Sequence, residues 1–171
     1  MKTSYIITFI GDDRPGLVEQ LSAVIERNGG NWHESRLSQL GGKFAGLILV
    51  SLPAQRSQSL ETQLGALAET GLSVRVTATC EGNVPAPGRD ITLTVLGPDR
   101  PGIVREISAA LARRHINVLE MDSEVNSAPM SAEMIFTARI AAWIPEATDM
   151  DDLTASLDEI ANQMTLEIDL A

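Results

Sequence analysis

The apolar positions in the first half of the chain change their spacing several times, and each spacing predicts a different element. Residues 4–10 form a β-branched and aromatic run that ends at Gly11, as expected for a buried strand. Apolar residues then recur at helical spacing as far as Gly29 and Gly30, a pair that favours the end of a helix. The predicted helix contains Leu17, Val18, Leu21, Val24 and Ile25.

The remainder of this half predicts a hairpin, a second helix and a last strand. Residues 31–40 and 44–52 are strand-like, and the Gly41-Gly42 turn between them predicts a β-hairpin. The second helix contains Leu60, Leu64, Leu67 and Ala68. Residues 72–77 then alternate as in a strand with one covered face. The predicted order of elements is therefore β-α-β-β-α-β.

The second half of the chain predicts the same order. Strands are expected at residues 90–96, 117–125, 134–141 and 166–170, with a turn at Pro129 before the third of them. The two helices contain Ile103, Val104, Ile107, Ala110 and Leu111, and Leu153, Leu157, Ile160 and Ala161.

The two halves also repeat each other residue by residue. The segment Gly11–Val18 returns as Gly97–Val104, an offset of 86 (97 minus 11), and further identities follow at the same offset. A repeat of this length is a whole small domain rather than a solenoid unit. We therefore predict two like domains, residues 1–80 and 89–171, joined by a Pro/Gly-rich linker at residues 81–88.

The predicted fold class is α+β, with two ferredoxin-like βαββαβ domains. Each domain is expected to be a four-stranded antiparallel sheet with two helices on one face. The second copy is longer by about seven residues, which we place at residues 141–149, in the loop before its last helix.

Charge and composition exclude several classes of function. The net charge is −10 and the thirteen basic residues are scattered, which argues against direct contact with nucleic acid. No apolar run approaches the roughly 20 residues that span a bilayer, and no signal peptide is recognisable. Cys80 is the one cysteine, so no internal disulfide forms. These features predict a cytoplasmic protein without membrane contact.

The repeated Asp-Arg-Pro-Gly joins the first strand of each half to the first helix. Unpaired amides and the dipole at a helix start favour a ligand carboxylate, and the aspartate is available to a ligand ammonium. An asparagine at the start of the next strand adds a donor and an acceptor. The candidate ligand-binding residues are Asp13, Arg14, Pro15, Gly16, Leu17 and Asn31, and Asp99, Arg100, Pro101, Gly102, Ile103 and Asn117.

A purely structural interpretation of this loop stays open. An aspartate before a helix is a common N-cap, Pro-Gly starts a helix, and in this interpretation Arg14 forms an ion pair with a neighbouring carboxylate. Elsewhere, His33 and His115 lack metal-ligand spacing, and Trp32 and Trp143 are isolated. We therefore expect no catalytic residue, no metal and no cofactor.

A βαββαβ unit with Gly-x-Asp-Arg-Pro-Gly after its first strand resembles an ACT domain. Two such units in a chain of this size are similar to the glycine cleavage system transcriptional repressor family, with Gly11–Val18 and Phe44–Val50 carrying the likeness in the first half. The resemblance implies a small amino acid, glycine or a similar one, as the ligand. It implies homodimers and a transcription factor as the protein partner, with one composite ligand site or two.

Two alternatives remain at this point. A free-standing amino-acid sensor that regulates a metabolic enzyme would have the same sequence features. Acylphosphatases share the ferredoxin-like fold and use an arginine in the first loop with an asparagine on the next strand. Arg14 with Asn31, and Arg100 with Asn117, resemble that pair, but the family's glycine-rich phosphate cradle is missing and Pro15 lacks an amide proton.

Overall fold

The chain contains two compact units, residues 1–83 and 84–171. The computed structural model describes residues 2–79, 87–129 and 132–171. Most of the predicted linker, together with Cys80, lies outside the described residues. Gly88, its last residue, already belongs to the first strand of the second unit.

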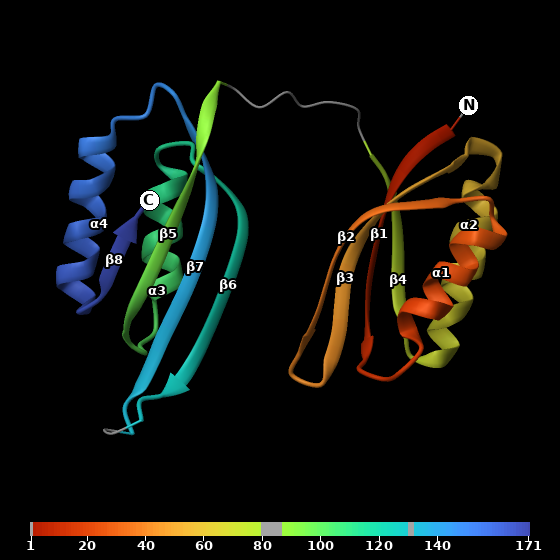
Figure 1. Ribbon diagram of the computed structural model, residues 1–171, viewed down its shortest axis with the longest axis horizontal. Helices are drawn as coiled ribbons and strands as arrows, with labels where there is room; N and C mark the ends of the chain where they lie inside the picture. The colour runs from red at the N-terminus through yellow and green to blue at the C-terminus, as the bar shows by residue number, and fades with distance from the viewer. Residues whose placement is uncertain (1, 80–86, 130–131) are drawn as a thin grey trace. The chain divides into compact units, whose positions relative to one another are not determined.

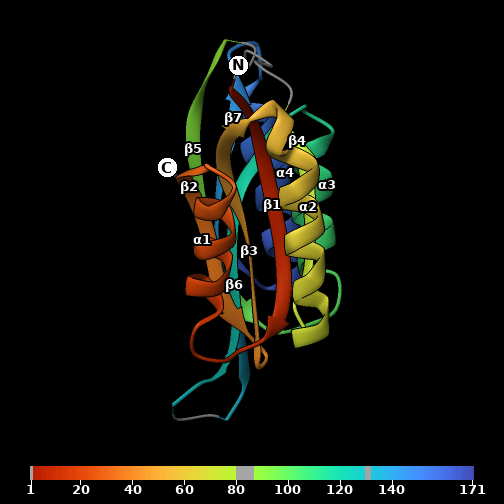
Figure 2. The same ribbon diagram turned by 90° about the vertical axis from the view of Figure 1, so that its right-hand side faces the viewer.

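The first unit has the predicted β-α-β-β-α-β order (Figure 1). Its elements are β1 (Lys2–Asp12), α1 (Leu17–Arg27), β2 (Asn31–Leu40), β3 (Lys43–Pro53), α2 (Ser57–Ala66) and β4 (Ser73–Ala78), with 3-10 turns at Ala54–Arg56 and Leu67–Thr70. The strands form one antiparallel sheet in the order β2-β3-β1-β4. Figure 2 views this unit from its helical side, with α1 and α2 in front of the sheet.

The second unit repeats this architecture. Its elements are β5 (Gly88–Pro98), α3 (Ile103–Ala112), β6 (Asn117–Ser127), β7 (Met134–Pro145), α4 (Met150–Met164) and β8 (Glu167–Leu170). The sheet order is β6-β7-β5-β8, with every pair antiparallel. Both helices cover one face of the sheet (Figure 1). The two ferredoxin-like α+β domains predicted from the sequence are confirmed.

Each unit packs its own hydrophobic core between its sheet and its helices. On β1, alternate residues Tyr5, Ile7 and Phe9 face the helices, because successive side chains of a strand point to opposite faces. They pack against the buried face of α1, which includes Leu21 and Ile25. The second core is equivalent and contains Leu93, Leu111 and Leu153, each at most 1% exposed. Most of the apolar positions that the helical spacing assigned to α1 and α3 are thus buried. Val18 and Val104 are the exceptions, because they are 42% and 46% exposed.

The extra residues of the second copy lie elsewhere than the sequence predicted. Lys2 pairs with Pro53, and Gly88 pairs with Pro145. The offset between equivalent residues is thus 86 in the first strands (88 minus 2) but 92 in the third strands (145 minus 53). Because β7 continues through residues 141–145 without interruption, six added residues belong to the β6–β7 hairpin. Their placement before the last helix was wrong.

Candidate functional site

Backbone hydrogen bonds attach the Asp-Arg-Pro-Gly loop of each unit to the neighbouring hairpin. In the first loop (residues 13–16), the Asp13 amide donates to the Gly42 carbonyl at 3.0 Å. In the second loop (residues 99–102), the Asp99 amide donates to the Met134 carbonyl at 2.8 Å. The loop therefore leaves the end of its strand in a fixed direction before the helix begins.

The glycine at the end of each loop is required by its backbone conformation. Gly16 has φ 91° and Gly102 has φ 101°, both in the left-handed region that other residues rarely adopt. A Cβ on Gly16 would meet nothing within 4 Å, and on Gly102 it would meet Met164 Cε at 3.9 Å. The space beside both glycines is thus open to an approaching group.

No side chain caps either helix start. Gly16 and Gly102 are the N-cap residues of α1 and α3, and neither cap has a side-chain hydrogen bond. The capping role that we considered for the loop aspartates was therefore wrong. Among the described residues, the carboxylates of Asp13 and Asp99 have no hydrogen-bond or ion-pair partner. Each unit thus presents the positive end of a helix dipole close to a free carboxylate.

Arg14 does not pair with a carboxylate. Its Nη2 lies 3.4 Å from Gln20 Oε1 and 3.4 Å from the Thr70 carbonyl oxygen, both long contacts. Within the described part of the chain, Arg100 forms no side-chain hydrogen bond or ion pair. The proposed ion pair of Arg14 was wrong, and both guanidinium groups lie at the protein surface with spare donors.

Each loop lines a shallow, open hollow, and the two hollows lie at equivalent places. The first loop hollow has a volume of about 250 Å³, and the second loop hollow about 600 Å³. Both contain the aspartate, arginine and glycine of their loop and the first residues of the helix. They also contain a phenylalanine from the neighbouring strand, Phe44 or Phe136, which was not among the site residues predicted from the sequence. The two phenylalanines occupy equivalent positions of the two copies, and this equivalence could have indicated from the sequence that they belong to the site.

The two hollows differ in charge. Glu19 lines the first and Arg105 lines the second, at the same position of the helix (105 minus 19 is again 86). The first hollow therefore has two carboxylates and one guanidinium, whereas the second has one carboxylate and two guanidinium groups. Ser108 adds a hydroxyl to the second hollow. The second hollow is the better match for an anionic group.

The structure does not bring the predicted asparagines to the loop of their own unit. Asn31 lies opposite Ser51 on β3, whereas Asp12, which precedes the first loop, lies opposite Lys43. These β3 residues are eight positions apart, which corresponds to about 26 Å along a strand. Asn117 is placed in the same way, opposite Trp143. Because the acylphosphatase-like alternative needs the loop arginine beside this asparagine, the geometry of each unit contradicts it.

An ion pair at the end of β1 distinguishes the first loop from the second. Lys43 Nζ donates to Asp12 Oδ1 across the β1–β3 pair. This hydrogen bond and the charge of Lys43 hold the pKa of the Asp12 carboxyl below its usual value. In the second unit Pro98 lies opposite Ile135 at the same register, so the ion pair has no counterpart there.

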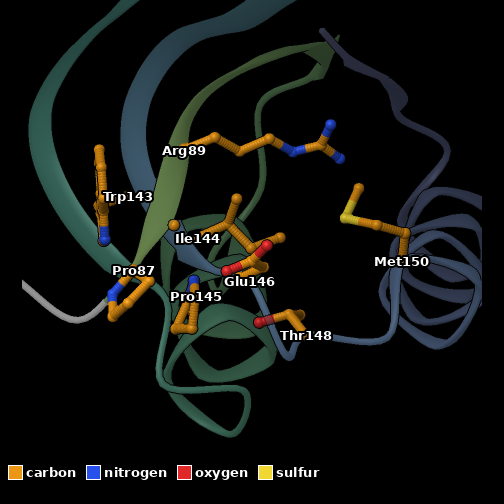
Figure 3. Close-up of a pocket in the computed structure, with 9 residues that line it drawn as sticks. Pro87, Arg89, Trp143, Ile144, Pro145, Glu146, Thr148 and Met150 are labelled. Carbon is orange, nitrogen blue, oxygen red and sulfur yellow. The ribbon is translucent and has the colours of Figure 1, made fainter.

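A larger hollow lies at the other end of the second sheet (Figure 3). This Trp143 hollow has a volume of about 680 Å³, and it contains Arg89, Trp143, Glu146 and Met150. Figure 3 shows Arg89 and Met150 extending toward each other, with Trp143 on the other side of β5. The side chains of Arg89 and Glu146 form no ion pair or hydrogen bond in the described part of the chain.

Other chemistry suggested by single residues is not assembled in the structure. His33 Nε2 lies 2.7 Å from the hydroxyl of Ser51, at a bulge of β2. Residues 2–79, 87–129 and 132–171 contain no group of three His, Cys, Asp or Glu side chains that could hold a metal ion. Within these same ranges, no helix is long and apolar enough to cross a membrane.

Comparison with known proteins identifies relatives over most of the chain. The chain is 23% identical over 163 residues to the glycine cleavage system transcriptional repressor of Escherichia coli, covering 95% of this chain and 86% of that protein. An unknown protein from Galdieria sulphuraria has a similar crystal structure, with TM-score 0.85, 28% identity and coverage of 99% and 98%. A protein assigned as a glycine cleavage system transcriptional repressor shares the fold, with TM-score 0.72, 20% identity and coverage of 100% and 97%.

Family models match both units. The ACT domain is matched at residues 3–77 and again at residues 91–141. The first match begins within β1 and ends within β4, and the second begins within β5 and ends within β7. The chain therefore belongs to the ACT-domain family, as a tandem of two ACT domains related to the glycine cleavage system transcriptional repressor.

Proposed function

We propose that this protein is a non-enzymatic regulator that binds a small amino acid at its Asp-Arg-Pro-Gly loops. The observation that carries the proposal is the pairing, in each unit, of an uncapped helix start with a free aspartate. A helix start binds a carboxylate, and an aspartate binds an ammonium group. A free amino acid carries both groups on neighbouring carbon and nitrogen atoms.

The second loop hollow is the principal ligand site in this proposal. It is larger than the first, and Arg100 and Arg105 both line it. Two guanidinium groups favour a ligand carboxylate more than one does, and Glu19 in the first hollow would repel it. The limited depth of both hollows suits a ligand with a small side chain, such as glycine.

A second ACT domain would complete each site. Asn31 and Asn117 lie at the far end of their own sheets, and they occupy the edge strands β2 and β6. Two such edge strands that pair antiparallel bring the start of one beside the end of the other, where the loop of that second domain lies. The asparagine amide of one domain then reaches the ligand held by another.

Regulation would follow from linkage between the ligand and a protein partner. A ligand that stabilises one arrangement of domains changes the affinity for any partner that prefers that arrangement. The net charge of −10 favours a protein partner over DNA, and a transcription factor agrees with the repressor relationship. The second candidate is a free-standing sensor that acts on a metabolic enzyme.

Calorimetric titration of the full chain with single amino acids tests the ligand. We expect glycine or a similarly small amino acid to bind, and Asp99→Asn to weaken binding by about tenfold or more because the ammonium loses its partner. Asp158→Asn is the matched control, since it makes the same charge change at an exposed position of α4. Failure of every amino acid to bind would overturn the proposal.

The same titration locates the site. If Arg89→Gln abolishes binding and Asp99→Asn leaves it intact, the ligand occupies the Trp143 hollow and the loop assignment is wrong. Affinity purification with and without the amino acid then chooses between a transcription factor and an enzyme. Capture of a transcription factor whose recovery changes with the ligand supports the regulator that we propose.

A further inference from the structure

Within each unit, the described helices cover one face of the sheet, and no described element of the same unit covers the other face (Figure 1). The first open face is apolar at its centre. Because Tyr5, Ile7 and Phe9 of β1 face the core, the residues between them point outward. Four large aliphatic side chains lie on the central strands of this face: Ile6 and Ile10 on β1, and Leu47 and Leu49 on β3. Ile10 is 50% exposed and Leu47 is 46% exposed.

An arginine lies at each end of the middle row of this face. Leu47 on β3 is opposite Arg36 on β2 and opposite Thr8 on β1. Thr8 is in turn opposite Arg75 on β4. The row across the four strands is therefore Arg36, Leu47, Thr8 and Arg75. Neighbouring strands lie about 4.8 Å apart, which separates the two arginine backbones by about 14 Å.

The equivalent row of the second open face ends in two aspartates. Arg139 on β7 is opposite Asp122 on β6, and Thr94 on β5 is opposite both Arg139 and Asp169 on β8. The row is therefore Asp122, Arg139, Thr94 and Asp169, with the same spacing of about 14 Å between its ends. The charges at the two ends are reversed relative to the first face.

The rest of the second open face is acidic as well. Register and alternation place six carboxylates on it: Asp90, Glu120, Asp122, Glu124, Glu167 and Asp169. Arg139 is the basic residue among them, so the charge of the face is −5. Residues 84–171 contain six basic and fifteen acidic residues, a net charge of −9, whereas residues 1–83 contain seven and eight, a net charge of −1.

These charges restrict what each face can bind. Two copies of the second open face repel each other, since like charges at short range cost several kcal/mol across an interface. The first open face exposes aliphatic side chains between Arg36 and Arg75. Glu34 on the same face forms an ion pair with Arg36 at 2.9 Å, and Asp12 pairs with Lys43. These three cations and two carboxylates of the first open face sum to a charge of +1, against −5 for the second. Asp122 and Asp169 of the second face therefore suit a surface whose positive charges lie about 14 Å apart. Arg36 and Arg75 of the first face have that spacing.

We propose that the first open face of one copy of this chain docks on the second open face of another copy. Packed sheets lie about 10 Å apart, a separation that arginine and aspartate side chains together can span. With β2 over β8, Arg36 meets Asp169 and Arg75 meets Asp122. This orientation places Arg139 over the Thr8 hydroxyl, and the opposite one would place it over Leu47. The opposite charges at the row ends thus favour binding of a first open face to a second open face. The position of Arg139 favours the orientation with β2 over β8.

The proposal does not depend on the amino-acid ligand, so its test is separate from calorimetry. Each copy has both faces, so two copies that dock reciprocally, each first face on the other's second face, form a closed dimer. Sedimentation velocity of the full chain without ligand should show this dimer, with a concentration-dependent population. The dimer should weaken between about 0.1 M and about 1 M salt, where the Debye length falls from about 10 Å to about 3 Å. A wild-type chain that stays monomeric throughout would leave these faces to a different partner and overturn the proposal.

Variants that reverse the charges at the row ends of one face test whether the two faces bind each other. Arg36→Asp with Arg75→Asp should weaken the dimer by about a hundredfold or more, because two attractive pairs become repulsive. Asp122→Arg with Asp169→Arg should do the same. An equimolar mixture of the two double variants should restore a mixed dimer. The acidic first face of one variant then meets the basic second face of the other, so opposite charges again lie across the interface.

The control makes the same change of charge away from the open face. Arg27→Asp with Arg56→Asp alters two arginines of the same unit, at the end of α1 and in the 3-10 turn before α2, and should leave the dimer intact. Circular dichroism checks that every variant is folded. Folded double variants that still dimerise alone, or that fail to associate when mixed, would both contradict the proposal.

Discussion

Glu19 and Arg105 occupy the same position of equivalent helices, and each lines the loop hollow of its own unit. The repeated loop itself keeps its aspartate, arginine and glycine in both copies, so these two residues set the difference in charge between the hollows. Duplicated sites that differ in this way are expected to differ in affinity for an anionic group.

Exchanging these charges should exchange the affinities. Arg105→Glu is expected to weaken binding of an amino acid at the second loop by about tenfold, because a carboxylate then faces the ligand carboxylate. Glu19→Arg should strengthen binding at the first loop by a comparable factor. Calorimetry of the two variants measures both changes. Equal affinities in wild type and both variants would show that neither residue contacts the ligand.

The left-handed glycines should not tolerate alanine. Gly16→Ala is expected to lower the free energy of unfolding of the first unit by about 1 kcal/mol, because an alanine at φ 91° is strained. Gly65→Ala is the control, since Gly65 lies in α2 with open space around its Cβ. That change should instead stabilise the unit by about 0.5–1 kcal/mol. Urea unfolding compares them, and a destabilising Gly65→Ala would contradict this account.

The buried face of α1 should carry most of the contribution of this helix to stability. Leu21 is 0% exposed in the first core, so Leu21→Ala is expected to cost about 2–5 kcal/mol. Val18, on the same helix, is 42% exposed, and Val18→Ala should cost less than about 0.5 kcal/mol. Thermal unfolding followed by circular dichroism gives the two values, which should differ severalfold.

The Asp12–Lys43 pair should contribute to stability only where Asp12 is ionised. Its folded pKa is lowered by the hydrogen bond from Lys43 and the charge of Lys43, so the contribution is present above the unfolded pKa of about 4. The contribution is lost as the pH falls through the folded value. The melting temperatures of wild type and Asp12→Asn should therefore converge in acid. A difference that persists at low pH would mean that Asp12 acts through something other than its charge.

The order of the elements was predictable because two stretches of sequence carried the same pattern. Alternation and helical spacing depend on nearby residues, and both copies agreed on them. The length of the β6–β7 hairpin was not predictable in this way. Turn residues around Pro129 leave no periodic pattern that fixes where a strand resumes. The apolar run through Trp143 matches the end of β3 only at an offset of 92, whereas the repeat earlier in the chain has an offset of 86.

The composition of the site was predictable only in part. The loop residues and the glycine conformations follow from the motif itself. Asn31 follows the loop closely in sequence, but α1 carries the chain back along the sheet by about 16 Å before β2 begins. Phe44 reaches the hollow from a neighbouring strand, so its place depends on a long-range pairing that the sequence pattern does not contain.

The hydrogen bonds from Asp13 to Gly42 and from Asp99 to Met134 couple each loop mechanically to a hairpin. A ligand that stiffens the loop must also slow the opening of that hydrogen bond. Exchange of these two amide protons with solvent therefore reports occupancy of each loop separately, without any label on the ligand. One nuclear magnetic resonance measurement could thus distinguish a chain with a single occupied loop from a chain with two.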